Sequence, residues 1–159
     1  MSTEKSTSQK VVRLLATWFG CGLSPKAPGT FGTLGAIPLC WLLFQVTTPL
    51  GYMLSTLIFS IAAIFVAHFH EATSGEHDAS EVVIDEVAGY LVAMAWMPFT
   101  WSYVVAAFFI FRLFDIWKPY PISYVDRQVK GGVGAVGDDL LAGILTNIVL
   151  QILLQRGIF

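Results

Sequence analysis

The sequence predicts an all-α fold: a small polytopic membrane bundle of about five short apolar helices, preceded by an amphipathic N-terminal lead-in. Three observations indicate this class. Hydrophobic residues make up 55% of the 159 residues and charged residues only 13%, which is about half the charged share of a soluble domain. Mean hydropathy is +0.68. No Asp, Glu, Lys or Arg occurs between Lys26 and Glu71, or between Glu86 and Arg112.

The elements follow from the breaks in the apolar pattern. Residues 1–19 begin polar and end in a short apolar stretch, so we expect a lead-in that is cytoplasmic or lies on the membrane surface. Residues 20–159 are expected to form one membrane domain. Its five apolar segments are 31–46, 50–69, 87–100, 101–117 and 140–155. The lengths of these segments are near or below the roughly 17 residues that a membrane span requires. The turn sequence "TTPLG" separates the first segment from the second, and "MPFT" separates the third from the fourth.

The distribution of lysine and arginine predicts the orientation. Lys5, Lys10, Arg13 and Lys26 precede the first apolar segment, which places the N-terminus in the cytoplasm. Five alternating crossings then bring loops 70–84 and 118–138 to the cytoplasmic face and turns 47–49 and 97–100 to the other face. Of the nine Lys and Arg residues, this arrangement leaves only Arg156 outside.

Four charged or glycine-rich stretches therefore meet at one membrane face. The first is "PKAPGTFGT" at residues 25–33, where small residues and two threonines precede an apolar helix. Backbone amides at a helix start attract anions, so Lys26, Thr30 and Thr33 are candidate phosphate-binding residues. The alternative is an ordinary loop in which a threonine caps the helix.

The second stretch, "HDASEVVIDEVAG" at residues 77–89, places Asp85 and Glu86 side by side among apolar residues. Carboxylates at membrane depth are costly and usually mark function. The alternative is a helix start, where acidic side chains favour the helix dipole. That alternative explains one acid better than an adjacent pair.

The third stretch, "FRLFDIWKPYPI" at residues 111–122, sets Arg112, Asp115 and Lys118 three residues apart on one helical face. The two cations can hold a phosphate, and Asp115 can bind a metal ion or orient either cation. The alternative is that both cations extend to the interface from the end of a span, which does not require Asp115.

The fourth stretch is "GGVGAVGDDLLAG" at residues 131–143. It predicts a glycine loop that a ligand can approach closely, followed by Asp138 and Asp139 at the start of the last helix. An acidic helix cap explains these two residues about equally well.

Taken together, the stretches indicate Mg²⁺-assisted phosphoryl transfer at the level of the lipid headgroups. Carboxylates are hard oxygen ligands, which suit Mg²⁺ together with phosphate oxygens, and two basic side chains suit the same phosphate. His68, His70 and His77 are interpreted as bystanders.

The four stretches, in this order, resemble the signature blocks of the phosphatidylglycerophosphatase A family, over about residues 20 to 150. The resemblance implies a Mg²⁺-dependent bacterial inner-membrane enzyme that converts phosphatidylglycerophosphate to phosphatidylglycerol and phosphate at the cytoplasmic face. Its implied partners are this phospholipid and the membrane, with no nucleic acid and no obligate protein partner. The acidic and basic positions of the family carry over to Asp85, Glu86, Asp115, Asp138 and Asp139, and to Arg112 and Lys118.

We assign Asp85, Glu86, Asp138 and Asp139 to metal binding, and Arg112 and Lys118 to catalysis and phosphate binding. Asp115 is assigned to catalysis, as a ligand, a base or a nucleophile. Two other classes stay open: a divalent-cation transporter, which predicts acids near the bilayer centre, and a membrane transferase that joins an alcohol to a nucleotide-activated lipid. That transferase class has an Asp-Gly-x-x-Ala-Arg block, which this sequence lacks.

Overall fold

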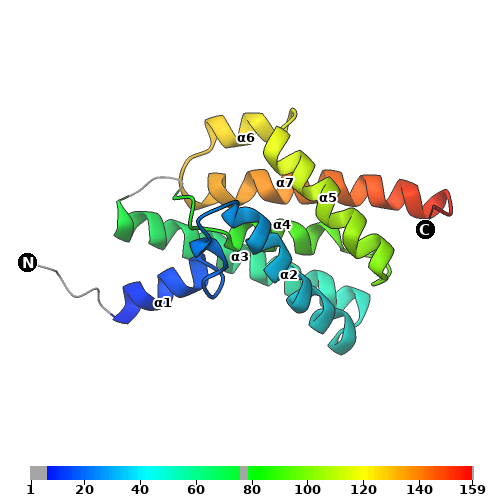
Figure 1. Cartoon of the computed structure of the whole chain (residues 1–159), viewed down its shortest axis with the longest axis horizontal. Coiled ribbons are helices and arrows are strands. Elements are labelled where there is room, and N and C mark those ends of the chain that lie inside the picture. Colours follow the sequence, from blue (N-terminus) through cyan, green and yellow to red (C-terminus); the bar gives the residue numbers. More distant parts are fainter. Residues whose placement is uncertain (1–6, 76–78, 159) are drawn as a thin grey trace, which may run out of the picture.

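The computed structural model describes residues 7–75 and 79–158, and all regular structure in these residues is helical (Figure 1). The predicted all-α class is confirmed. The helices, in chain order, are α1 (Thr7–Ala16), the 3-10 turn η1 (Cys21–Leu23), α2 (Pro28–Val46), α3 (Pro49–Ser74), α4 (Ile84–Ala93), α5 (Trp101–Trp117), α6 (Ile122–Gln128) and α7 (Gly131–Gln155).

Among the described residues, three helices are long and apolar enough to cross a membrane, judged by length and composition: α2, α3 and α7. The turn between α2 and α3 is fixed by Thr48, whose Oγ1 accepts a hydrogen bond from the Gly51 amide at 3.1 Å. Large apolar side chains of α3 remain exposed, among them Leu57, Ile58 and Phe65. An exposed apolar face on a long helix is what a lipid environment favours.

The predicted third span, 87–100, is corrected by the structure. α4 has only 10 residues, from Ile84 to Ala93, so it rises about 15 Å, half the thickness of a bilayer core. The chain then turns at Trp96, which has a φ of 60°. α4 is nevertheless apolar because it is the buried centre of the bundle: most of its residues are enclosed by neighbouring helices.

Glycines bring α4 and α7 into backbone contact. A Cβ atom on Gly89 would lie 2.6 Å from the Asp139 carbonyl oxygen, and one on Gly143 would lie 2.3 Å from the Gly89 carbonyl oxygen. No side chain fits at these distances. The close contact fixes the position of Asp139 on α7 relative to the start of α4.

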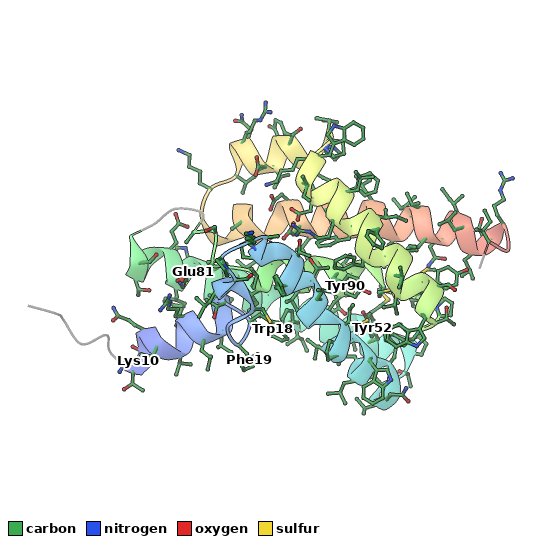
Figure 2. All side chains as sticks on the ribbon, in the orientation of Figure 1. Lys10, Trp18, Phe19, Tyr52, Glu81 and Tyr90 are labelled. Atoms are coloured by element: carbon green, nitrogen blue, oxygen red, sulfur yellow. The ribbon has the colours of Figure 1, made fainter. Side chains whose placement is uncertain are left out.

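Two tyrosines anchor the core that surrounds this contact. The Tyr52 hydroxyl donates to the Leu91 carbonyl at 2.8 Å, and the Tyr90 hydroxyl donates to the Val104 carbonyl at 3.0 Å. Both rings are buried within the bundle (Figure 2). Each hydroxyl thus has the partner that a buried polar group requires, and α3 and α5 are tied to α4.

The helix directions give the bundle two distinct ends (Figure 1). α2, α4 and α7 begin at the end where α3 and α5 finish, so the segments before α2, before α4 and around α6 gather there. The lead-in also lies at this end, where α1 packs against α3. The four charged stretches are therefore brought to one end, as the sequence predicts.

Candidate active site

A cavity of about 350 Å³ opens at this end of the bundle, and five helices contribute to its lining. Among the described residues that line it, six carry carboxylates and two carry cations: Asp85, Glu86, Asp115, Asp126, Asp138 and Asp139, with Arg112 and Lys118. Like charges in a partly buried space repel one another strongly. The cavity is therefore suited to bind cations, and suited to bind a phosphate only once cations are present.

Three of the carboxylates form a compact cluster. Asp85 and Glu86 stand in the first turn of α4, and Asp139 comes from α7; one oxygen of each lies within 4.8 Å of the others. Glu86 Oε2 is buried and has no hydrogen-bond partner among the described residues. Closely spaced carboxylates that are buried or half-buried, one with an unpaired oxygen, fit a hard divalent cation such as Mg²⁺.

Arg112 lies beside this cluster, between two carboxylates. It forms an ion pair with Asp115 one turn along α5, and its Nη1 lies 3.7 Å from Glu86 Oε1. Its Nε is buried and unpartnered in the described part of the chain. The guanidinium therefore keeps a donor available next to the acidic cluster.

Lys118 also lines the cavity, where it pairs with acids of α6 and α7. Its Nζ lies 2.7 Å from Asp138 Oδ2 and also pairs with Asp126 of α6. Burial alone would lower the pKa of Lys118, but the ion pairs with Asp126 and Asp138 outweigh burial and raise the pKa above its usual value. Lys118 is therefore a firmly charged cation that two carboxylates hold in place.

Asp126 is the residue of this site that sequence reasoning missed. It lies on the seven-residue helix α6, a segment that the sequence predicts to be part of the loop 118–138. A single acid in a mixed-charge loop carries no distinctive pattern. Only the folding of α6 back over α7 brings Asp126 to Lys118.

Gly29 allows the start of α2 to form one wall of the cavity. A Cβ atom there would lie 2.1 Å from Glu86 Oε1 and 2.8 Å from Arg112 Nη1. These distances are far below any van der Waals contact, so only glycine permits both side chains to hold their positions.

Two predicted loops are helical in the structure. α2 begins at Pro28, so most of the stretch 25–33 belongs to its first turns, and α7 begins at Gly131, so the whole glycine run lies inside it. The glycines serve packing: a Cβ on Gly132 would lie 2.3 Å from the Ile64 carbonyl oxygen. Asp138 and Asp139 consequently lie beyond the first turn of α7, which has no acidic residue, and a helix-cap role for them is excluded.

The remaining predicted residues are placed around the cavity rather than in its lining. Thr33 is buried and its Oγ1 donates to the Gly29 carbonyl at 2.8 Å. Thr30 and Lys26 are not among the described residues that line the cavity. Lys26 is exposed and directly precedes Ala27, which does line the cavity. Their role in phosphate binding stays a prediction. His77 and Asp78 lie outside the described residues, and His70 is buried against Glu81.

The apolar helices and the cavity rich in carboxylates at one end of the bundle place the protein in the class of helical membrane proteins with a polar site. Comparison with known proteins is more specific. The family model described as Phosphatidylglycerophosphatase A matches residues 14–154, and the chain belongs to this family.

Two curated relatives carry the name Phosphatidylglycerophosphatase A. The Escherichia coli K12 protein is 40% identical over 134 residues, covering 84% of this chain and 77% of the relative. The Haemophilus influenzae Rd protein is 34% identical over 154 residues, covering 93% and 94%. A Bacteroides thetaiotaomicron relative, 38% identical over 148 residues with 87% and 91% covered, is named provisionally as a phosphatidylinositol-3-phosphatase. No solved structure matches the chain.

Proposed function

We propose that this protein is a Mg²⁺-dependent lipid phosphatase that hydrolyses phosphatidylglycerophosphate to phosphatidylglycerol and phosphate at the cytoplasmic face of the bacterial inner membrane. The observation that carries the proposal is the cavity at the end of an apolar bundle, where three clustered carboxylates lie beside Arg112 and Lys118. Its position lets the lipid tails stay in the bilayer while the headgroup enters. The family and the named relatives support the substrate.

Asp85, Glu86 and Asp139 would hold the metal ion. Bound Mg²⁺ supplies positive charge that neutralises the phosphate and lowers the pKa of a water molecule. The cluster fits this role because its ligands are hard oxygens and because Glu86 has an unpaired buried oxygen. Asp138, which was also predicted as a ligand, pairs with Lys118, and we propose that it positions this cation.

Arg112 and Lys118 would bind the phosphomonoester, which carries nearly two negative charges at neutral pH. During hydrolysis a water oxygen attacks phosphorus, the bond from phosphorus to the glycerol oxygen breaks, and that oxygen takes up a proton. Asp115 lines the cavity and pairs with Arg112, and we propose one of two roles for it. Either it accepts the proton of this water, or it attacks phosphorus first, which releases the glycerol oxygen and leaves a phosphorylated Asp115 that water then hydrolyses. Acid-quenched enzyme carries a phosphoryl group only in the second case.

The test of substrate is phosphate release by the purified protein from mixed micelles with Mg²⁺. We expect phosphatidylglycerophosphate to be hydrolysed about tenfold faster than phosphatidylinositol 3-phosphate, because a primary phosphate on a flexible glycerol reaches the cavity with less steric hindrance than a phosphate on a ring. A preference for the inositol lipid would instead align this chain with the activity named for the Bacteroides relative.

The orientation has a separate test. Gln128 on α6 and Thr100 before α5 lie at opposite ends of the bundle, and each can be replaced by a single cysteine. In a variant lacking Cys21 and Cys40, we expect an impermeant thiol reagent to label position 100 but not position 128 in intact spheroplasts. The reverse pattern would place the cavity on the outer face and contradict the proposed access to a cytoplasmic lipid headgroup.

A further inference from the structure

A chain of polar contacts joins the lead-in to the segment that carries the acidic pair. Arg13 of α1 donates from Nε and Nη2 to the two Glu81 carboxylate oxygens, at 2.9 and 2.6 Å. His70 of α3 contacts Glu81 Oε1 through Nε2 at 3.1 Å. Glu81 thus stands between α1 and the C-terminal part of α3 (Figure 2), four residues before Asp85.

This contact fixes which nitrogen of His70 carries a proton. The hydrogen bonds from Arg13 hold the pKa of Glu81 below its usual range, so at neutral pH this carboxylate is ionised and only accepts hydrogen bonds. His70 Nε2 must therefore be the protonated nitrogen that donates to Glu81. In the neutral ring, Nδ1 is then left as an acceptor.

His70 Nδ1 has no partner among the described residues, although the side chain is only 5% exposed. The ring borders a cavity of about 20 Å³ that adjoins the larger one, and this volume is just sufficient for one water molecule. Asp85 lines both cavities. Besides His70 and Asp85, Glu71 is the polar residue in the lining of the small cavity, and the rest of the lining is apolar, including Ala67 and Val82.

We propose that His70 is a positioning residue for Asp85, acting through one water molecule held in the small cavity. The water donates one hydrogen to His70 Nδ1 and the other to the Asp85 carboxylate, which directs a carboxylate oxygen toward Glu86 and Asp139. Arg13 and Glu81 keep the ring in the required tautomer. The inference rests on the proposed role of Asp85 in metal binding. Mutation of a residue that hydrogen-bonds to a metal-ligating carboxylate typically lowers metal affinity by 10–100-fold, so loss of His70 should be measurable as weaker metal binding.

Two substitutions separate the nitrogens of His70. Asparagine places its amide near the position of Nδ1, and glutamine places its amide near that of Nε2. His70→Asn therefore keeps the contact with the cavity and loses the contact with Glu81, whereas His70→Gln does the opposite. A role limited to tying Glu81 and α1 to α3 would make glutamine the tolerated replacement.

The measurement is Mn²⁺ binding to the purified, detergent-solubilised protein, followed by the electron paramagnetic resonance signal of free Mn²⁺, which requires no turnover. We expect His70→Gln to weaken binding about tenfold or more and His70→Asn to stay within about threefold of wild type. Equal affinity of His70→Gln and wild type, or a loss in His70→Asn as large as in His70→Gln, would overturn the proposal.

Filling the small cavity gives an independent variant. Ala67→Val leaves His70 and Asp85 unchanged but occupies the space assigned to the water, so it should weaken Mn²⁺ binding as His70→Gln does. Unchanged binding in Ala67→Val would exclude the water. Absence of Mn²⁺ binding in wild type would reject the metal site of the proposed function itself, whereas normal wild-type binding with unaffected variants rejects only the role of His70.

Discussion

Asp139→Asn is expected to lower turnover of phosphatidylglycerophosphate by about a hundredfold or more, while the protein remains folded in the membrane. Asparagine keeps the size of the side chain and removes the charge that would hold a metal ion in the proposed site, and loss of a ligand or base commonly costs this much. Asp139 is almost fully buried beside Asp85 and Glu86. Asp85→Asn should behave in the same way.

Asp138→Asn is the matched comparison, because it makes the same change one residue earlier on α7. Asp138 pairs with Lys118 instead of joining the cluster, so this variant should retain Mn²⁺ binding that Asp139→Asn loses. For Asp85, in the first turn of α4, a helix-capping role predicts little change, since asparagine caps about as well as aspartate. Near-normal turnover of both Asp85→Asn and Asp139→Asn would refute the metal assignment.

Arg112→Lys is expected to lower turnover efficiency by about tenfold or more although the charge is conserved. Arginine presents a planar fork that can hold two phosphate oxygens, and lysine presents one compact charge. A charge-assisted hydrogen bond is worth roughly 1.5–3 kcal/mol, which corresponds to at least about tenfold in rate. The fork here also contacts Asp115 and Glu86, and a lysine cannot reproduce both contacts and bind phosphate.

Turnover of Arg112→Lys should be compared with that of wild type at equal membrane abundance, in mixed micelles. Lys118→Arg, which adds a fork on the opposite side of the cavity, is the companion variant and shows whether any exchange of basic residues is tolerated. If Arg112 serves only to anchor the end of α5 at the membrane surface, lysine reaches that surface equally well. Equal turnover rates of Arg112→Lys and wild type would therefore leave Lys118 as the phosphate-binding cation of the stretch 111–122.

The convergence of the four charged stretches could be predicted from sequence because it depends on chain direction. Alternating apolar helices return the segments before α2, before α4 and after α5 to one end. The acids of the site lie in the helix turns near that end, with Asp138 and Asp139 a little further inside α7. The structure adds which contacts the two adjacent acids make. Asp139 lies in the carboxylate cluster with Asp85 and Glu86, whereas Asp138 forms an ion pair with Lys118. Adjacent residues of a helix point in different directions, and only the position of α7 decides which one meets α4.

The glycine-rich stretches illustrate why the rest could not be predicted. Glycine is a weak helix former in isolation, so "GGVGAVG" indicates a loop from local preference alone. In the bundle, Gly132, Gly89 and Gly143 lie where backbones touch, and the packing that they permit outweighs the local preference. The same limitation applies to α4, whose apolar run indicates a membrane span but whose 10 residues form a buried central helix.

The most direct test of the central claim is phosphate release from phosphatidylglycerophosphate by the purified protein, measured after treatment with a chelator and again after Mg²⁺ has been added. The cavity lining carries six carboxylates against two cations among the described residues, so without a divalent cation it should repel the phosphate of the substrate. We expect release to fall to background in the chelator and to recover with Mg²⁺, and to recover less in Asp139→Asn at any Mg²⁺ concentration. Full activity in the chelator would contradict the account.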